Sequence, residues 1–143
     1  MSVRMVKLSA KMEDYLKSIS NLARETGVTR VKDIGAALNV KTSSVHAALH
    51  SLMDKGLLEH ERYGYVRLTE EGKRMAAEII ERQDLIECFL REVLNVSPEH
   101  AAEDACRMEH VLSRETLGRM RILLDQVRCR IRVRPPGACA RQP

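Results

Sequence analysis

The sequence predicts a mainly α-helical chain, with an N-terminal module that includes a small β-hairpin and a C-terminal module made of helices alone. Three observations support this fold class. Apolar residues recur at helical spacing in several long runs. The 143 residues include only seven Gly and four Pro, and aromatic residues make up 3% of the chain. An all-β sandwich or barrel needs many turns and many aromatic strand residues, so that fold class is excluded.

The composition is typical of a folded protein that is not embedded in a membrane. Of all residues, 44% are apolar and 31% are charged. No apolar run approaches the roughly 18 residues that cross a bilayer, and no signal peptide precedes Met12. We therefore expect a cytoplasmic location and no membrane partner. In that compartment the four cysteines should be reduced thiols; they are Cys88, Cys106, Cys129 and Cys139.

The N-terminal module is expected to begin with helices joined by tight turns. Ser9 is a suitable N-cap for a first helix, in which apolar residues recur at helical spacing. A short helix over residues 31–38 follows. A turn of about four residues then leads to a helix that ends at Gly56, and Thr42 or Ser43 can cap that helix. Two helices joined in this way form a helix-turn-helix.

A β-hairpin is expected directly after the second helix of this motif. Residues 57–62 and 65–68 have the pattern of two short strands, and Gly64 in the turn between them can adopt a positive φ. A hairpin at this place makes the motif a winged helix-turn-helix with a two-stranded β wing. We assign this module to residues 1–73.

Residues 74–127 are expected to form the second, helical module. Thr69 begins a long helix whose apolar stripe is wider than the first module can cover. Another helix starts at Pro98, and Ser113 caps the last one. The simplest explanation of this module is a dimerisation domain, so we expect a homodimer. The last segment, 128–143, is rich in Arg and is expected to be a basic, flexible tail.

The charge is distributed unevenly between these segments. Residues 1–73 carry a net charge of +3, residues 74–127 carry −4 and residues 128–143 carry +5, which together give the net charge of +4. A basic module joined to an acidic one suggests that one face binds a polyanion and that another region holds cations. Ordinary variation of surface charge is the alternative explanation.

The helix that starts at Pro98 carries a cluster of groups that can bind a metal ion. Cys106, Glu109 and His110 lie at positions i, i+3 and i+4, within one turn. On a helical wheel, Glu109 falls at the edge of the buried stripe, where a carboxylate is unstable unless a cation or hydrogen-bond donors meet it. This donor set suits a first-row divalent ion. In the alternative explanation, Glu109 pairs with an Arg and Cys106 only packs.

Several segments resemble the diphtheria toxin repressor and manganese transport regulator family. The resemblance extends over about residues 8–127. The matching segments are Met12–Leu16, Val31–Gly35, Lys41–Val45, Gly56–Leu57, Leu68–Gly72 and Ala105–Ser113. In that family a divalent ion bridges the first helix to the dimerisation domain, and the dimer then binds an operator. The resemblance implies a metal-dependent (Fe²⁺ or Mn²⁺) transcriptional repressor that controls genes of metal-ion homeostasis.

The resemblance also implies four metal ligands, which are Asp14, Cys106, Glu109 and His110. The family has a His where this chain has Gln83, one turn before Glu87, and its manganese branch has a Glu where this chain has Lys17. Gln83 and Glu87 are therefore weaker candidate ligands for a second ion. A thiolate beside carboxylates and an imidazole favours Fe²⁺, with Mn²⁺ next, and Co²⁺, Ni²⁺ or Zn²⁺ could also bind in vitro.

The winged helix implies a surface that binds double-stranded DNA. Its expected residues lie on the recognition helix and on the wing; they are Lys41, Thr42, Ser43, Ser44, His46, Ala47, His50, Arg62 and Arg67, with Tyr63 beside them. Hydroxyls and the helix N-terminus suit phosphates, whereas Ala47 suits a thymine methyl group. His46 and His50 form a zinc-capable pair, but no further ligands accompany it. A dimer should recognise a palindromic operator, with half-sites separated by whole turns of DNA.

Two other classes of function compete with a metal-dependent repressor. A winged-helix regulator could respond to oxidation of Cys88 or Cys106 in place of a metal. An enzyme would need catalytic groups, but the sequence contains no nucleophile–base pair, no Gly-rich phosphate loop and no HExxH motif. We therefore do not expect an enzyme.

Overall fold

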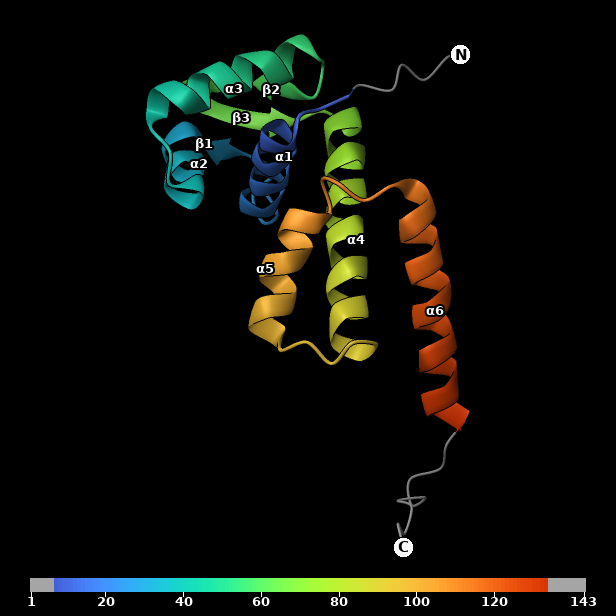
Figure 1. Cartoon of the computed structure of the whole chain (residues 1–143). Helices are drawn as coiled ribbons and strands as arrows, with labels where there is room; N and C mark the ends of the chain where they lie inside the picture. Colours follow the sequence, from blue (N-terminus) through green and yellow to red (C-terminus); the bar gives the residue numbers. More distant parts are fainter. Residues whose placement is uncertain (1–6, 134–143) are drawn as a thin grey trace, which may run out of the picture. The chain divides into compact units, whose positions relative to one another are not determined.

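The computed structural model describes residues 7–133, and these are mainly helical, as predicted (Figure 1). The chain forms two compact units, residues 1–80 and 81–143. The boundary falls inside α4 (Glu70–Glu92), some way after the expected boundary at residue 73. In the part of the chain that the structure describes, no helix is both long enough and apolar enough to span a bilayer.

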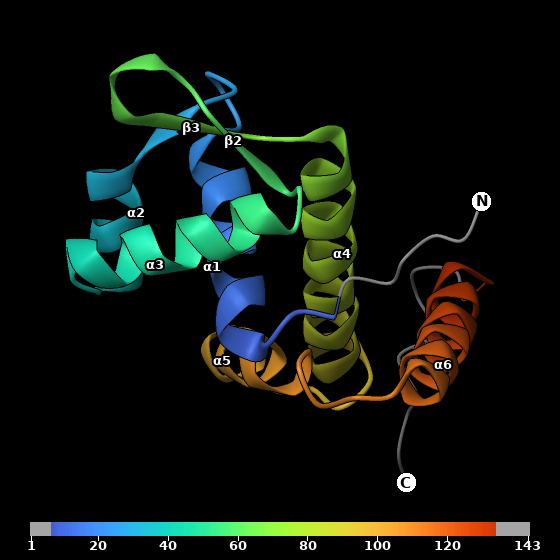
Figure 2. The same cartoon turned by 90° about the horizontal axis from the view of Figure 1, so that it is seen from above.

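The first unit has the helix-turn-helix and hairpin that the sequence predicts. Its elements are α1 (Ala10–Leu22), β1 (Thr29–Arg30), α2 (Val31–Leu38), α3 (Thr42–Asp54), β2 (Leu58–His60), a 3₁₀ turn (Arg62–Gly64), β3 (Tyr65–Leu68) and the start of α4. Ser9 caps α1, because the Met12 N–H donates to Ser9 Oγ at 3.3 Å. Figure 2 shows the β2–β3 hairpin extending to one side of α2 and α3. This hairpin is the wing.

The sheet has one strand more than the expected two-stranded wing. Its three antiparallel strands lie in the order β1-β3-β2, so that β3 is central. In the β1–β3 ladder, Thr29 pairs with Val66 and Arg30 pairs with Tyr65. The two-residue strand β1 is too short to show an alternating pattern, and this explains why the sequence did not indicate it.

One apolar core holds the first unit together. Leu16 and Ile19 of α1 are fully buried, as are Ile34 of α2, Val45 and Leu52 of α3. They pack with residues of β2, β3 and α4 in a single cluster. Because α3 contributes one face to this core, its opposite face lies at the surface. The core therefore packs against the inner face of the recognition helix and leaves its outer face exposed.

The start of α3 differs from the expectation. Thr42 and Ser43 do not cap it; the N-cap residue is Lys41, which has no side-chain capping hydrogen bond. The hydroxyls of Thr42 and Ser43 lie in the exposed first turn of the helix. They are consequently available for contacts outside the chain.

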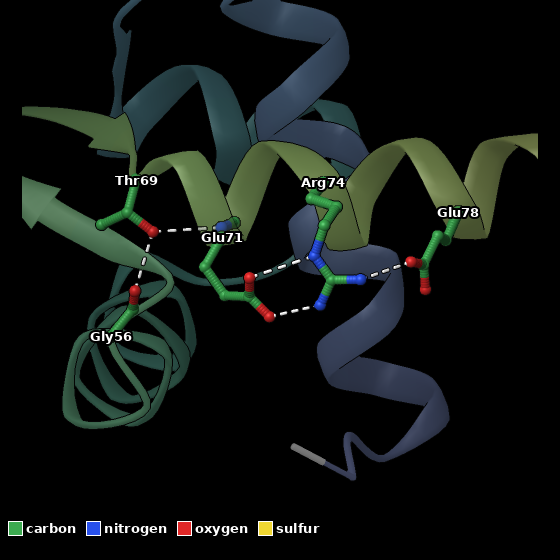
Figure 3. A network of polar contacts seen from close by, with 6 residues as sticks. Gly56, Thr69, Glu71, Arg74 and Glu78 are labelled. Atoms are coloured by element: carbon green, nitrogen blue, oxygen red, sulfur yellow. Dashed lines mark hydrogen bonds and ion pairs between the residues drawn. The ribbon is translucent and has the colours of Figure 1, made fainter. Parts of the chain in front are cut away.

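A polar network joins the end of α3 to the start of α4 (Figure 3). The Thr69 hydroxyl donates to the Gly56 carbonyl at 2.7 Å and accepts from the Gly72 N–H at 3.0 Å. Further along α4, Arg74 binds Glu71 and Glu78. The hydrogen bond from Arg74 lowers the pKa of the Glu71 carboxyl below its ordinary value. The Thr69 hydroxyl thus links the start of α4 to the segment after α3, whereas the Arg74 pairs lie within α4 itself.

The second unit contains the rest of α4, then α5 (Pro98–Met108) and α6 (Arg114–Val133). Its core is a cluster of six buried residues, which are Ile86, Leu90, Ala101, Ala105, Leu117 and Met120. Ser113 caps α6, as predicted, because its Oγ accepts from the Thr116 N–H at 3.2 Å. Two pairs tie α6 to α4: Arg121 Nη2 lies 3.0 Å from Glu81 Oε1, and Arg128 binds Glu92 with both Nε and Nη2.

The prediction of a flexible tail over residues 128–143 is wrong for residues 128–133. Helix α6 continues to Val133, because Arg is a good helix former and Arg128 is held by Glu92. The hydrogen bond from Arg128 also lowers the pKa of Glu92. Residues 134–143, with Cys139, lie outside the described residues. Among the described residues, Cys88 and Cys129 are free thiols, as expected for a reduced chain.

Candidate functional site

The end of α5 brings a thiol and a buried carboxylate close together. Cys106 Sγ and a carboxylate oxygen of Glu109 lie within 4.8 Å of each other. The Glu109 side chain is completely buried, whereas Cys106 is half-buried. The helical wheel placed Glu109 at the edge of the apolar stripe; the structure buries it fully. A buried carboxylate needs a cation or several donors for its stability, so this position is suited to positive charge.

His110 lies beside this pair for a reason that the helical wheel does not capture. A continuous helix would place it on the side opposite the apolar stripe. Instead, α5 ends at Met108, and the Val111 and Leu112 N–H groups both donate to the Met108 carbonyl. The chain turns there, and His110 Nε2 comes to 3.6 Å from Glu109 Oε1 with its side chain only 12% exposed. Three potential donors thus gather at the end of one helix.

The donor chemistry and spacing of these residues fit a divalent transition-metal ion. Metal–oxygen and metal–sulfur bonds are about 2.0–2.3 Å long, so a single ion can span Cys106 Sγ and the Glu109 carboxylate, which lie within 4.8 Å of each other. The His110 imidazole is close to that carboxylate, with Nε2 at 3.6 Å from Oε1. A thiolate, a carboxylate and an imidazole together form a borderline-soft set that suits first-row ions. The residues present therefore fit the ion that the sequence predicts.

Asp14, the remaining expected ligand, belongs to the first unit. It lies on α1 with its side chain 39% exposed, and its Oδ1 is 3.6 Å from Lys17 Nζ. The lysine is the less exposed partner, at 14%. The carboxylate is therefore on the surface of its unit and already stabilises one cation.

The two weaker candidates for a second ion lie on α4, in the second unit. Gln83 and Glu87 are both half-buried. Glu87 Oε1 lies 3.4 Å from Arg91 Nη1. Among residues 7–133, Glu87 is in no group of three closely spaced acidic, His or Cys donors. The surroundings of Glu87 in the described residues therefore do not favour a second metal site.

The predicted DNA-binding residues of α3 share one exposed face. Lys41, Thr42, Ser43, His46, Ala47 and His50 are all exposed, and Ser44 is half-buried. The intervening residues of α3 belong to the core. The face combines hydroxyls, imidazoles and one methyl group, without an acidic side chain, which suits contacts with phosphates and base edges.

The wing presents one aromatic and two basic side chains. Tyr63 is 91% exposed at the hairpin tip, with Gly64 next to it, and both have a positive φ. Positive φ was expected at Gly64 alone. Arg62 and Arg67 are exposed, as predicted, but Arg67 forms an ion pair with Glu61. Part of the charge of Arg67 is therefore neutralised inside the wing.

The sequence did not single out Arg30 or Tyr65, which form a contact at the edge of the sheet. The guanidinium carbon of Arg30 lies 4.6 Å from the centroid of the Tyr65 ring, and the guanidinium donates to the Tyr65 hydroxyl. The β1–β3 pairing brings these residues together. Only a prediction of that pairing could have found them.

Comparison with family models matches both halves of the chain. Residues 7–66 match the iron-dependent repressor N-terminal DNA-binding domain. Residues 69–135 match the iron-dependent repressor metal-binding and dimerisation domain. Cys106, Glu109 and His110 lie within the second match, and the face of α3 lies within the first. The wing residue Arg67 lies between the two matches.

Curated relatives are similar over most of the chain. The transcriptional regulator MntR of Escherichia coli O6:H1 is 43% identical over 115 residues, which cover 80% of this chain and 74% of the relative. The HTH-type transcriptional regulator MntR of Geobacillus thermodenitrificans is 37% identical over 109 residues, covering 76% and 77%. Both names describe transcriptional regulators, not enzymes.

Solved structures share the fold. The crystal structure of IdeR from T. acidophilum has a TM-score of 0.72 at 29% identity, covering 86% of this chain and 56% of that one. A manganese-dependent transcriptional repressor in complex with manganese has a TM-score of 0.72 at 28% identity, with coverages of 80% and 52%. This chain thus spans about half the length of these solved proteins.

Proposed function

Because this chain belongs to the iron-dependent repressor family of metal-dependent, DNA-binding transcriptional regulators, we propose that it represses genes of metal-ion homeostasis when a divalent ion binds to it. The observation that carries this proposal is the buried Glu109 carboxylate beside Cys106 and His110. These residues lie in the segment that matches the metal-binding domain of the family.

The proposed metal ligands are Asp14, Cys106, Glu109 and His110. The last three come from one helix end, and Asp14 comes from α1 of the other unit. An ion held by both sets would act as a cross-link between the winged helix and the second unit. The ion would have a structural role only. It would favour one arrangement of the DNA-binding units over others, and this preference would strengthen DNA binding.

Two arguments bear on the identity of the ion. The thiolate of Cys106 is a softer ligand than Mn²⁺ prefers, which favours Fe²⁺. A similar solved protein is described as a manganese-dependent repressor in complex with manganese, and another, ScaR, was solved with bound Zn²⁺. We propose one divalent transition-metal ion per subunit, with Fe²⁺ and Mn²⁺ as the physiological candidates.

DNA recognition is proposed to require two copies of the chain. A homodimer would place two α3 helices in successive major grooves of a palindromic operator, about 34 Å or one turn of DNA apart. The protein would do so in the cytoplasm. The exposed face of α3 would contact base edges, and the wing residues Arg62, Tyr63 and Arg67 would contact the backbone or the minor groove. The alternative signal, thiol oxidation, has no support in the comparisons.

The experiment compares Cys106→Ala and Glu109→Gln with Cys129→Ala, which removes an exposed thiol from α6. After anaerobic purification, metal analysis should find about one Mn²⁺ or Fe²⁺ per subunit in the wild type and in Cys129→Ala. Fluorescence anisotropy should then show that the metal-loaded forms of both proteins bind operator DNA more tightly than the metal-free forms. The two site variants should lose at least about tenfold in metal affinity. Equal DNA affinity of the wild type in chelator and in excess metal would refute the proposal.

A further inference from the structure

Arg30 lies at the junction between the sheet and α2 in the winged helix. It is the last residue of β1 and the N-cap of α2, and it pairs with Tyr65 in the β1–β3 ladder. Tyr65 follows directly after the wing turn at Gly64. Arg30 is therefore on the same sheet as the wing but belongs to a strand that the wing hairpin does not include.

Two contacts with Tyr65 fix the direction of the Arg30 side chain. The guanidinium lies over the aromatic ring, with 4.6 Å between its carbon and the ring centroid. The same guanidinium donates a hydrogen bond to the Tyr65 hydroxyl. A planar guanidinium that is stacked in this way has lost much of its rotamer freedom before any ligand arrives. A ligand would then bind it at a lower entropic cost.

The charge of Arg30 remains available, in contrast to that of Arg67. Arg67 forms an ion pair with Glu61 in the wing. Within the described residues no carboxylate forms an ion pair with Arg30, and its partner in both contacts is the neutral Tyr65. Arg30 is nevertheless exposed to solvent. It is thus an oriented cation at the surface whose charge is not compensated by an acidic partner.

A hollow beside this pair gives an anion room to approach. Its volume is about 350 Å³, and its lining includes Thr26, Arg30, Lys32, Asp33 and Tyr65. Two cations and one carboxylate line it, so its net charge is positive. The Thr26 hydroxyl is already used, since it donates to the Val28 carbonyl at 2.8 Å. Arg30 and Lys32 are the two cations of this lining, and Arg30 is the one whose direction is fixed by contacts with Tyr65.

We propose that Arg30, held in place by Tyr65, binds a phosphate of the DNA backbone beside the wing. This inference rests on the proposed DNA-binding function and adds to it a contact outside the recognition helix and the β2–β3 hairpin. The guanidinium donates N–H hydrogen bonds to two phosphate oxygens, a geometry that Arg matches better than Lys does. Such a contact fixes the register of the protein on the duplex and carries no base specificity.

The test measures how DNA affinity depends on salt for the metal-loaded, full-length protein. Each phosphate contact contributes about 0.9 to the slope of log K against log salt concentration, so a dimer that loses two contacts should lose about 1.8. We expect Arg30→Gln to show this loss, together with about tenfold weaker binding to the operator and to an unrelated duplex alike. The ratio of the two affinities should stay unchanged.

Matched variants separate this role from a purely structural one. Arg74→Gln makes the same charge change on α4, where the guanidinium is engaged by Glu71 and Glu78, and should keep the wild-type slope. Arg30→Lys should keep the slope but weaken binding, whereas Tyr65→Leu should weaken binding through loss of the stacking. Arg30→Met serves as a second charge-removing variant, with the thermal unfolding midpoint as the check of folding.

The outcomes are distinct for the two proposals. A wild-type slope for both Arg30→Gln and Arg30→Met, in folded protein that still binds DNA, overturns the role of Arg30 and leaves the proposed function intact. A wild-type protein whose DNA binding ignores metal overturns the proposed function. A slope reduced by about 1.8 together with an unchanged specificity ratio supports the phosphate contact.

Discussion

At the scale of single residues, the candidate metal ligands are already involved in interactions within the protein. Asp14 has Lys17 Nζ at 3.6 Å, and this lysine is only 14% exposed. A metal ion that binds Asp14 must share this carboxylate with the ammonium group or displace it, and the two cations repel each other. Lys17 therefore competes with the metal, and the chain should bind its ion less tightly than the same donors would without the lysine.

Replacing this lysine tests the competition directly. We expect Lys17→Gln to lower the Kd for Mn²⁺ by about tenfold, since it removes the cation that competes for Asp14. Lys11→Gln makes the same charge change at an exposed position of α1 and should leave the Kd unchanged. Isothermal titration calorimetry under anaerobic conditions measures both values. Weaker metal binding by Lys17→Gln would show that the lysine supports the site.

At the scale of elements, the joint between α3 and α4 depends on a glycine. A Cβ atom at Gly72 would lie 2.1 Å from the Leu57 carbonyl oxygen, which is backbone and accepts a hydrogen bond from the Thr69 N–H. It would also approach Leu68 Cδ2 at 3.2 Å. Only glycine lets the first turn of α4 lie this close to the segment that leaves the recognition helix.

We therefore expect Gly72→Ala to destabilise the protein despite the better helix propensity of Ala. The overpacking should cost about 1–3 kcal/mol in the free energy of unfolding. Gly118→Ala is the matched control, because a Cβ there meets nothing within 4 Å; it should stabilise α6 by up to about 1 kcal/mol. Urea denaturation followed by circular dichroism compares the two. Equal or greater stability of Gly72→Ala would contradict this packing.

The same scale shows which features the sequence could predict. The caps expected at Ser9, Thr69 and Ser113 form capping hydrogen bonds, because a cap depends on residues about three positions away. The cap expected at Thr42 or Ser43 does not form, because α3 begins one residue earlier than that cap requires, with Lys41 as its N-cap. The pairing of Arg30 with Tyr65 joins residues far apart in the sequence and left no local signal. The burial of Glu109 was also underestimated. Its backbone is still helical, but a helical wheel shows only the side of the helix on which a residue lies and not what packs against that side.

At the scale of the whole molecule, the second unit has more apolar surface than one subunit can bury. In the described part of the chain, Ile122 and Leu123 of α6 are 53% and 42% exposed, and Leu94 is 56% exposed. By contrast, Leu117, Met120 and Leu124 of the same helix are buried. The matching family domain is described as a dimerisation domain. We infer that the exposed apolar face of α6 is covered by a second copy of the chain.

Charges placed on this face should separate the subunits without unfolding them. We expect Ile122→Glu combined with Leu123→Glu to raise the dimer Kd by about a hundredfold or more, because buried anchors dominate such interfaces and unpaired charges of one sign are costly there. Leu22→Glu, on a residue of the first unit that is 39% exposed, should leave the dimer intact. Sedimentation velocity measures the association.

Since a monomer can occupy only one half-site, operator affinity should fall together with dimerisation, whereas binding of Mn²⁺ through Cys106 and Glu109 should persist. A variant that stays dimeric would place the interface elsewhere on the second unit.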